Sequence, residues 1–158
     1  MKKATLILAL SLIVSVVPVF SFGIGAAFGV DGALGVDGTV GPGALLSFRL
    51  DSYPAVFGLG FSTGGGSFSL GATADWWLYN ASLISILSLY VGPGVYLDLN
   101  IYDGNVAFGA GVRVPVGLQA WIIEPLELFF EVAPTFGLKN GDFPAFGVQG
   151  AVGFRFWF

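Results

Sequence analysis

The sequence predicts an all-β fold: a transmembrane, antiparallel, up-and-down β-barrel of eight strands, preceded by an N-terminal signal peptide. Apolar residues make up 55% of the 158 residues and charged residues only 10%, whereas an ordinary soluble domain has about 25% charged residues. Along most of the chain, apolar residues alternate with small or polar ones, which is the pattern of strands with two different faces. No run of 18 apolar residues follows Phe22, so membrane-spanning helices are not expected there.

Residues 1–21 have the features of a signal peptide, and we expect the barrel domain to cover residues 22–158. Two lysines precede a largely apolar stretch, and Val19 and Ser21 are small enough for the −3 and −1 positions of a cleavage site. An uncleaved transmembrane anchor is the alternative. Pro18 and the lack of a charged stop-transfer group favour cleavage.

Eight segments alternate with a period of two and are predicted to be strands. In the last of them, the even positions from Phe146 to Phe158 are mostly apolar, and the odd positions are mostly small or polar. Most segments approach or exceed the roughly 9 to 11 residues that a tilted strand needs to cross a bilayer. In chain order, the predicted strands cover residues 22–30, 44–50, 55–63, 67–78, 86–99, 106–121, 126–138 and 145–158.

The connections between these strands are of two kinds. Tight turns with proline occur at 51–54 and 122–125, and segments rich in Gly, Asp and Asn occur at 31–43, 100–105 and 139–144. In bacterial outer-membrane barrels, short turns face the periplasm and longer loops face outside. An even number of strands returns both termini to one side, so we expect both termini in the periplasm.

Charged residues avoid the apolar face of every predicted strand. After position 21, half of them lie in the connections and the others all lie on the face with small residues. Because a lipid-facing Arg or Lys costs about 2 to 4 kcal/mol at mid-depth in such barrels, we expect the small-residue face to line the lumen. The charges on that face are Arg49, Asp75, Asp98, Arg113, Glu127, Glu131 and Arg155.

Two other β architectures share this pattern. A soluble barrel or sandwich would leave glycine-rich strands outside with few charges to cover them, which is poor for packing and solubility. A secreted aggregating β-protein is the other alternative, and the charges within strands and the frequent turns count against it.

The interior charges are expected to form a neutral ionic network that fills the lumen. An eight-stranded barrel has an interior just wide enough for side chains to fill, and buried charges persist only when they are paired. A last hairpin that turns around Gly141 would place Glu127 nearly opposite Arg155, and Arg113 is expected to pair with Glu131 or Asp75. The predicted network consists of Arg49, Asp75, Arg113, Glu127, Glu131 and Arg155.

All four tryptophans fall at the predicted periplasmic rim. This placement predicts an aromatic girdle at one membrane interface. A general preference of tryptophan for strand ends is the alternative. The girdle would consist of Trp76, Trp77, Trp121 and Trp157.

The C-terminal run 152–158, with alternating aromatic residues and a final Phe158, resembles the assembly signal of bacterial outer-membrane barrels. Segments 111–118 and 125–134 resemble the small eight-stranded outer-membrane barrels related to the OmpA membrane domain and OmpX. This resemblance implies an outer-membrane location among its lipids and insertion by the barrel assembly machinery, with Phe154, Phe156 and Phe158 as the signal. Unlike OmpX-like adhesins, the chain is expected to have short external loops, and unlike OmpA it is expected to lack a periplasmic domain after the last strand.

The composition restricts the possible functions. The chain has no histidine and no cysteine, so zinc clusters, thiolate nucleophiles, disulfides and histidine-based acid–base pairs are excluded. We expect no enzymatic activity, no cofactor and no metal, and the acidic balance argues against nucleic-acid binding. The expected function is that of a monomeric, structural or surface-exposed barrel, with any surface ligand left open. A narrow or gated channel is the alternative, and a lipid-modifying enzyme would lack the base for a serine nucleophile.

A short tandem repeat lies in the segment 31–43. Asp31-Gly32 and Asp37-Gly38 are typical of turns. A weak calcium site that uses both aspartates is the alternative, although two carboxylates fall short of the six to eight oxygens, roughly, that calcium takes.

Overall fold

A computed structural model of the chain describes residues 21–33, 41–64, 66–139 and 141–158. The predicted signal-peptide residues up to position 20 and the centre of the segment 31–43 lie outside the described residues. Among the described residues, none forms a helix long and apolar enough to cross a membrane. The strands are β1 (Phe22–Ala33), β2 (Gly41–Leu50), β3 (Ala55–Gly64), β4 (Ser67–Trp76), β5 (Tyr79–Ile84), β6 (Leu87–Val91), β7 (Gly94–Tyr102), β8 (Asn105–Arg113), β9 (Val116–Ile123), β10 (Leu126–Lys139) and β11 (Asp142–Trp157).

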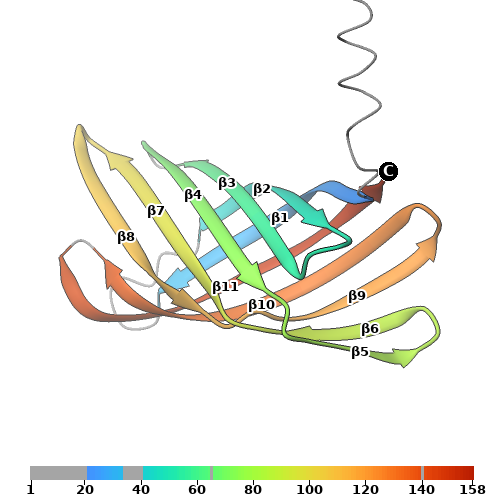
Figure 1. Ribbon diagram of the computed structural model, residues 1–158. Coiled ribbons are helices and arrows are strands. Elements are labelled where there is room, and N and C mark those ends of the chain that lie inside the picture. Colours follow the sequence, from blue (N-terminus) through green and yellow to red (C-terminus); the bar gives the residue numbers. More distant parts are fainter. Residues whose placement is uncertain (1–20, 34–40, 65, 140) are drawn as a thin grey trace, which may run out of the picture.

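Eight of these strands form a closed antiparallel ring in the order β11-β1-β2-β3-β4-β7-β8-β10, which the pairing of β10 with β11 completes (Figure 1). Strand β1 pairs with the last strand from Gly23 opposite Trp157 to Ala33 opposite Gly147. Closure satisfies the backbone groups that an open sheet would leave at its two edges. The predicted all-β barrel of eight antiparallel strands is confirmed.

The other three strands continue ring strands toward one end of the barrel. Strand β9 pairs with the first half of β10 and with β6, and β6 pairs with β5. Breaks before β7 and β9 fall at Pro93 and Pro115, which have no backbone N–H to donate to the sheet. The sequence predicted single strands over 86–99 and 106–121, and it did not predict a strand over 79–84, where the alternation is weak; the structure corrects both points.

The barrel has two distinguishable ends. At the terminal end, the backbones of Phe22 and Phe158 form two hydrogen bonds with N–O distances of 3.0 and 3.2 Å, and the β2–β3, β5–β6 and β9–β10 turns lie at this end (Figure 1). At the distal end, the β7–β8 hairpin turns through Asp103 and Gly104, both with positive φ angles, as a two-residue hairpin loop requires. The β7–β8 and β10–β11 connections are shorter than predicted because their strands extend farther.

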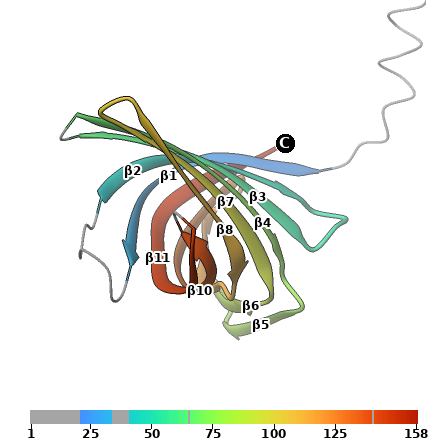
Figure 2. The same cartoon turned by 90° about the vertical axis from the view of Figure 1, so that its left-hand side faces the viewer.

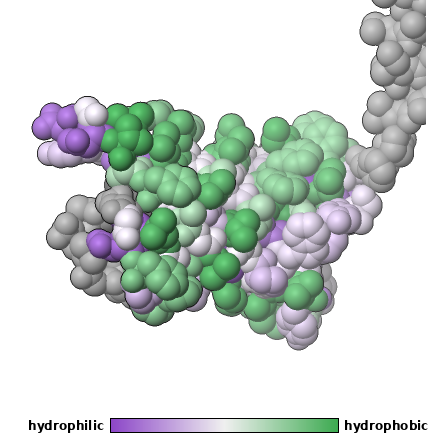
Figure 3. All heavy atoms as spheres, turned by 60° about the vertical axis from the view of Figure 1, so that its left-hand side comes forward, coloured by the Kyte–Doolittle hydropathy of each residue, from purple (hydrophilic) through white to green (hydrophobic). Residues whose placement is uncertain are grey.

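The two faces of the wall differ in chemistry as the alternation predicts. The outward face exposes large apolar side chains along nearly every strand, and apolar residues cover most of the visible surface in Figure 3. The buried polar and charged side chains lie inside the barrel, together with an apolar cluster of Val56, Trp77 and Tyr90. The interior therefore holds the groups from which a site could be built.

Candidate functional site

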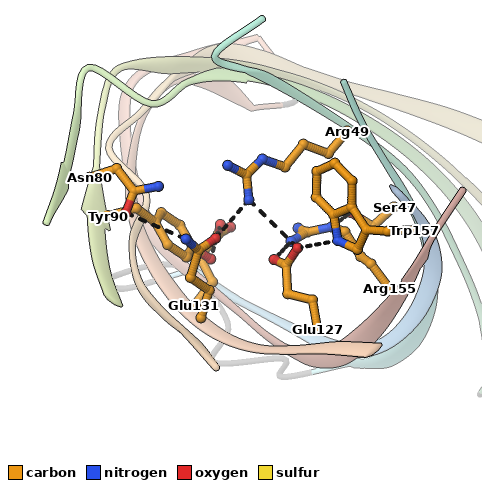
Figure 4. Close-up of polar contacts among 9 residues, drawn as sticks. Ser47, Arg49, Asn80, Tyr90, Glu127, Glu131, Arg155 and Trp157 are labelled. Carbon is orange, nitrogen blue, oxygen red and sulfur yellow. Dashed lines mark hydrogen bonds and ion pairs between the residues drawn. The ribbon is translucent and has the colours of Figure 1, made fainter. Parts of the chain in front are cut away.

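The first half of the charged interior is organised around Glu127 of β10. This residue lies directly opposite Arg155 of β11 in the strand register, as the predicted turn around Gly141 requires. The Arg155 Nη1 atom donates to Glu127 Oε1 at 2.6 Å, and both side chains are almost completely buried. The indole N–H of Trp157 donates to the other carboxylate oxygen at 2.7 Å, and Arg155 Nε donates to the Ser47 hydroxyl at 2.8 Å (Figure 4).

Arg49 of β2 brings a second positive charge to the same carboxylate. Its Nη1 atom lies 3.6 Å from Glu127 Oε2 and donates to Gln119 Oε1 at 2.6 Å. In Figure 4 the Arg49 side chain reaches across the lumen between Glu127 and Glu131. Glu127 is thus surrounded by two guanidinium groups and one indole donor, so its buried negative charge is compensated.

The second half of the network is organised around Arg113 of β8. Its Nε atom lies 3.1 Å from Asp75 Oδ1 of β4, its Nη2 atom forms an ion pair with Glu131 of β10, and its Nη1 atom donates to Gln149 Oε1 at 2.7 Å. The sequence left Glu131 and Asp75 as alternative partners, and the structure gives Arg113 both. One guanidinium group therefore joins β4, β8, β10 and β11 across the lumen.

An aromatic stack connects the two halves. The Trp77 and Tyr90 rings lie nearly parallel, with centroids 3.6 Å apart and an interplanar angle of 12°. The Arg49 guanidinium carbon lies 4.2 Å from the centroid of the Trp77 ring, in cation–π range. On its other side the stack is fixed by the Tyr90 hydroxyl, which donates to Glu131 Oε2 at 2.9 Å.

The tryptophans do not form the predicted lipid-facing girdle. Trp77 and Trp157 are only 4% and 8% exposed and lie inside the barrel, and Trp121 is half-buried beside Trp157, at 5.4 Å between ring centroids. Of the four tryptophans only Trp76 is exposed, and it packs edge-on against Tyr53. The alternation itself could have revealed this, because Trp76 and Trp77 are consecutive and Trp157 shares the parity of Arg155.

Three polar residues of the site were not singled out from the sequence. Ser47, Gln119 and Gln149 each hydrogen-bond an arginine of the network. All three have the parity of the small-residue face, and that signal could have identified them. The proposed assembly-signal residues lie on the opposite face: Phe154, Phe156 and Phe158 are all exposed.

A cavity of about 1080 Å³ lies between the network and the distal end. Arg113, Glu131, Asp75 and Arg155 contribute to its lining, and its wall includes many Gly and Ser residues and the remaining interior charge, Asp98. The lumen therefore has two parts: a filled terminal half and a hollow distal half. The network separates them.

The structure assigns no metal site from the residues that it describes: no group of three or more acidic side chains is close enough to hold an ion. Asp37, one of the two predicted calcium ligands, lies outside the described residues. The backbone of Asp31 continues β1 opposite Gln149, so this Asp-Gly pair is part of a strand and not of a turn.

Solved structures include one that is similar to the chain over most of its length. It is the crystal structure of Neisserial surface protein A (NspA), with a TM-score of 0.61, 17% sequence identity, and coverage of 88% of this chain and 97% of that chain. At this level of identity the similarity shows the fold alone. A comparison with protein-family models gives no match, and neither does a comparison with curated protein sequences.

Proposed function

We propose that the chain is a non-enzymatic outer-membrane β-barrel with a structural or surface-exposed role, and that its ionic network closes the lumen. In this proposal residues 1–21 are an export signal, the mature chain is a monomer, and the barrel assembly machinery inserts it through the signal of Phe154, Phe156 and Phe158. The specific relation to the OmpA membrane domain and OmpX, suggested by segments 111–118 and 125–134, is part of the same proposal.

The membrane location is supported by the distribution of apolar and charged side chains. The outward face carries large exposed apolar groups, including Phe28, Leu59 and Phe154, which is unfavourable in water as one contiguous surface. The ring pairs its eight strands around the barrel, as a sheet in hydrocarbon requires. Among the described residues, unpaired strand edges remain at β5, which pairs with β6 alone, and at 105–108 of β8. The similarity in fold to a protein named as a surface protein points in the same direction.

The position of Arg113 is the single observation that best supports a closed lumen. It contacts Asp75 and Glu131 on two other strands, while the Trp77–Tyr90 stack and Arg49 fill the adjoining cross-section. Separating these buried ion pairs would leave uncompensated charges, each of which costs several kcal/mol. This cost disfavours a continuous aqueous path and argues for a structural barrel.

A narrow or gated channel is the second candidate function. The distal cavity favours it, because this cavity reaches the network at Arg113 and Arg155. Ion passage would then require only the ion pairs of one layer to separate. The absence of His and Cys from the sequence leaves no comparable support for an enzyme.

Site-specific labelling tests the location and the orientation. The chain has no cysteine, so a single Asn105→Cys substitution in the exposed β7–β8 hairpin provides one unique thiol, and Ser52→Cys in the exposed β2–β3 turn is the matched control. We expect a membrane-impermeant maleimide to label Asn105→Cys on intact cells and Ser52→Cys only after lysis. Purified protein in detergent should be β-rich and should change its gel mobility on boiling. Recovery in the soluble fraction, or labelling with the opposite preference, would overturn the proposal.

A further inference from the structure

Strand β8 extends beyond its neighbour β10 at the distal end of the barrel. Arg113 to Gly109 pair with Thr135 to Lys139 of β10, whereas 105–108 pair only with β7 among the residues that the structure describes. In Figures 1 and 2 the tip of the β7–β8 hairpin is well separated from the tip of the β10–β11 hairpin. The wall therefore divides between β8 and β10 at this end.

A crevice lies in this gap and adjoins the distal cavity. It has a volume of about 290 Å³ and is lined by Val106, Ala107, Phe108, Leu138 and Gly141. All of these except Gly141 also line the distal cavity. Because the crevice and the cavity share these residues, the two spaces adjoin between β8 and β10.

The surroundings of this opening are apolar on the outside. Val106 is 66% exposed and Phe108 is 49% exposed, and both face away from the lumen because Ala107 and Gly109 alternate with them. If the proposed membrane location holds, lipid chains lie in front of the gap. An aliphatic chain could pass from there into the cavity without crossing water.

The interior offers space of the right kind for such a chain. The cavity volume of about 1080 Å³ is slightly larger than the roughly 300 to 1000 Å³ typical of ligand sites. Glycines on three strands, Gly60, Gly71 and Gly109, keep its wall free of bulk. Arg113 and Glu131 lie at the floor, and polar residues such as Ser69, Asp98 and Asn100 also line the wall. An apolar chain would therefore lie along the glycines and the apolar side chains of the wall.

The entrance offers polar partners for a head group. On the side of β8 that faces β10, the backbone N–H and C=O groups between Asn105 and Phe108 have no partner strand among the described residues. In hydrocarbon, unpaired backbone groups cost free energy unless a polar group binds them. Lys139, the last residue of β10, lines the same cavity and is exposed. Its ammonium group attracts an anionic head group, and the carboxylate of Asp142, which is opposite Lys139 in the strand register and lines the same cavity, repels one.

We propose that the gap between β8 and β10 admits one chain of a single-chain anionic amphiphile, such as a fatty acid, from the membrane into the distal cavity. The chain fills the cavity above the network, and the head group stays at the edge of β8 near Lys139. This inference rests on the proposed membrane location and not on whether the network conducts ions.

Photo-crosslinking of the full-length barrel in lipid nanodiscs tests the proposal. The probe is a fatty acid with a diazirine near the end of its chain, and the sites of attachment are mapped by mass spectrometry. We expect attachment to inward-facing residues such as Tyr96 and Thr73. Ala107→Trp, which fills the gap, should reduce this attachment about tenfold, whereas Ala110→Trp, outward on the same strand, should leave it unchanged.

A second variant tests the head group. Lys139→Gln should reduce attachment of the fatty acid but not of the neutral alcohol with the same chain and diazirine. Attachment confined to outward-facing residues, equal attachment in both tryptophan variants, or a cross-linked pair of chains joined at β8 would overturn the inference. Cell fractionation of the same variants shows whether the membrane location or only the fatty-acid site is wrong. If the proposed function is wrong, the protein will not be recovered with the outer membrane.

Discussion

Gly117 of β9 lies directly against the ring of Tyr90, so that a Cβ atom added to Gly117 would be 2.2 Å from Tyr90 Cζ. The two residues are partners in the β6–β9 register and both face the lumen. Small residues on one strand thus make room for a large side chain on the next. The chain has 25 glycines. Some of them are explained by the narrow interior, where a large side chain on one strand requires a small residue on the next.

Gly117→Ala should therefore destabilise the barrel. The added methyl group would also be 2.7 Å from the Phe130 carbonyl oxygen, so neither the ring nor the backbone can remain in place, and overpacking of this kind costs about 1 to 3 kcal/mol. Gly60→Ala is the matched control, because its added Cβ would meet nothing closer than 3.7 Å. Urea unfolding in lipid vesicles measures both, and equal stabilities would contradict the packing argument.

Tyr90→Phe should remove one hydrogen bond and retain the stack on Trp77. The Tyr90 hydroxyl donates to the buried carboxylate of Glu131, and hydrogen bonds to charged groups contribute about 1.5 to 3 kcal/mol. The same unfolding measurement should show a loss in that range. Tyr79→Phe, at an exposed position of β5, should change stability by less than about 0.5 kcal/mol.

Glu127→Ala should be among the most destabilising substitutions in the barrel. It leaves the guanidinium groups of Arg155 and Arg49 buried without their shared carboxylate, and removal of one partner of a buried pair costs about 3 to 5 kcal/mol. Glu124→Ala is the control: it removes a carboxylate that is exposed to water in the β9–β10 turn, three residues earlier. This substitution should have little effect on stability. Similar losses in the two variants would show that Glu127 is not an essential member of the network.

Two neighbouring leucines test which face of the wall meets lipid. Leu46 points outward and is 55% exposed, whereas Leu45 lines the distal cavity. In a bilayer, Leu46→Arg should cost about 2 to 4 kcal/mol near mid-depth, and Leu45→Arg should cost less because its charge enters a partly polar cavity. The reverse order, measured by unfolding from vesicles, would indicate a barrel with its apolar face turned away from lipid.

Much of this arrangement follows from local sequence. Alternation assigns Arg113, Glu127 and Arg155 to the inward face, and the turn around Gly141 fixes the register that places the last two opposite each other. The contacts across the lumen depend on ring closure instead. Arg49 and Gln119, for example, are 70 residues apart in the chain, and no periodicity within either strand relates them.

The errors also have physical causes. Tryptophan at a strand end is typical of a lipid interface, but the indole of Trp157 gains a buried acceptor in Glu127, and a buried indole N–H requires such a partner. The strand breaks at Pro93 and Pro115 leave the inward and outward alternation intact. For that reason the period alone did not reveal them.

Planar-bilayer recording of the refolded full-length protein tests the central claim most directly, because the claim is that Arg113 and its partners close the lumen of an eight-stranded barrel. The account predicts no steady single-channel conductance for the wild-type protein after its insertion is verified by the gel-mobility shift. Steady conductance of the wild type that changes in Arg113→Ala would contradict it, since ions would then pass through the layer that the network is proposed to seal.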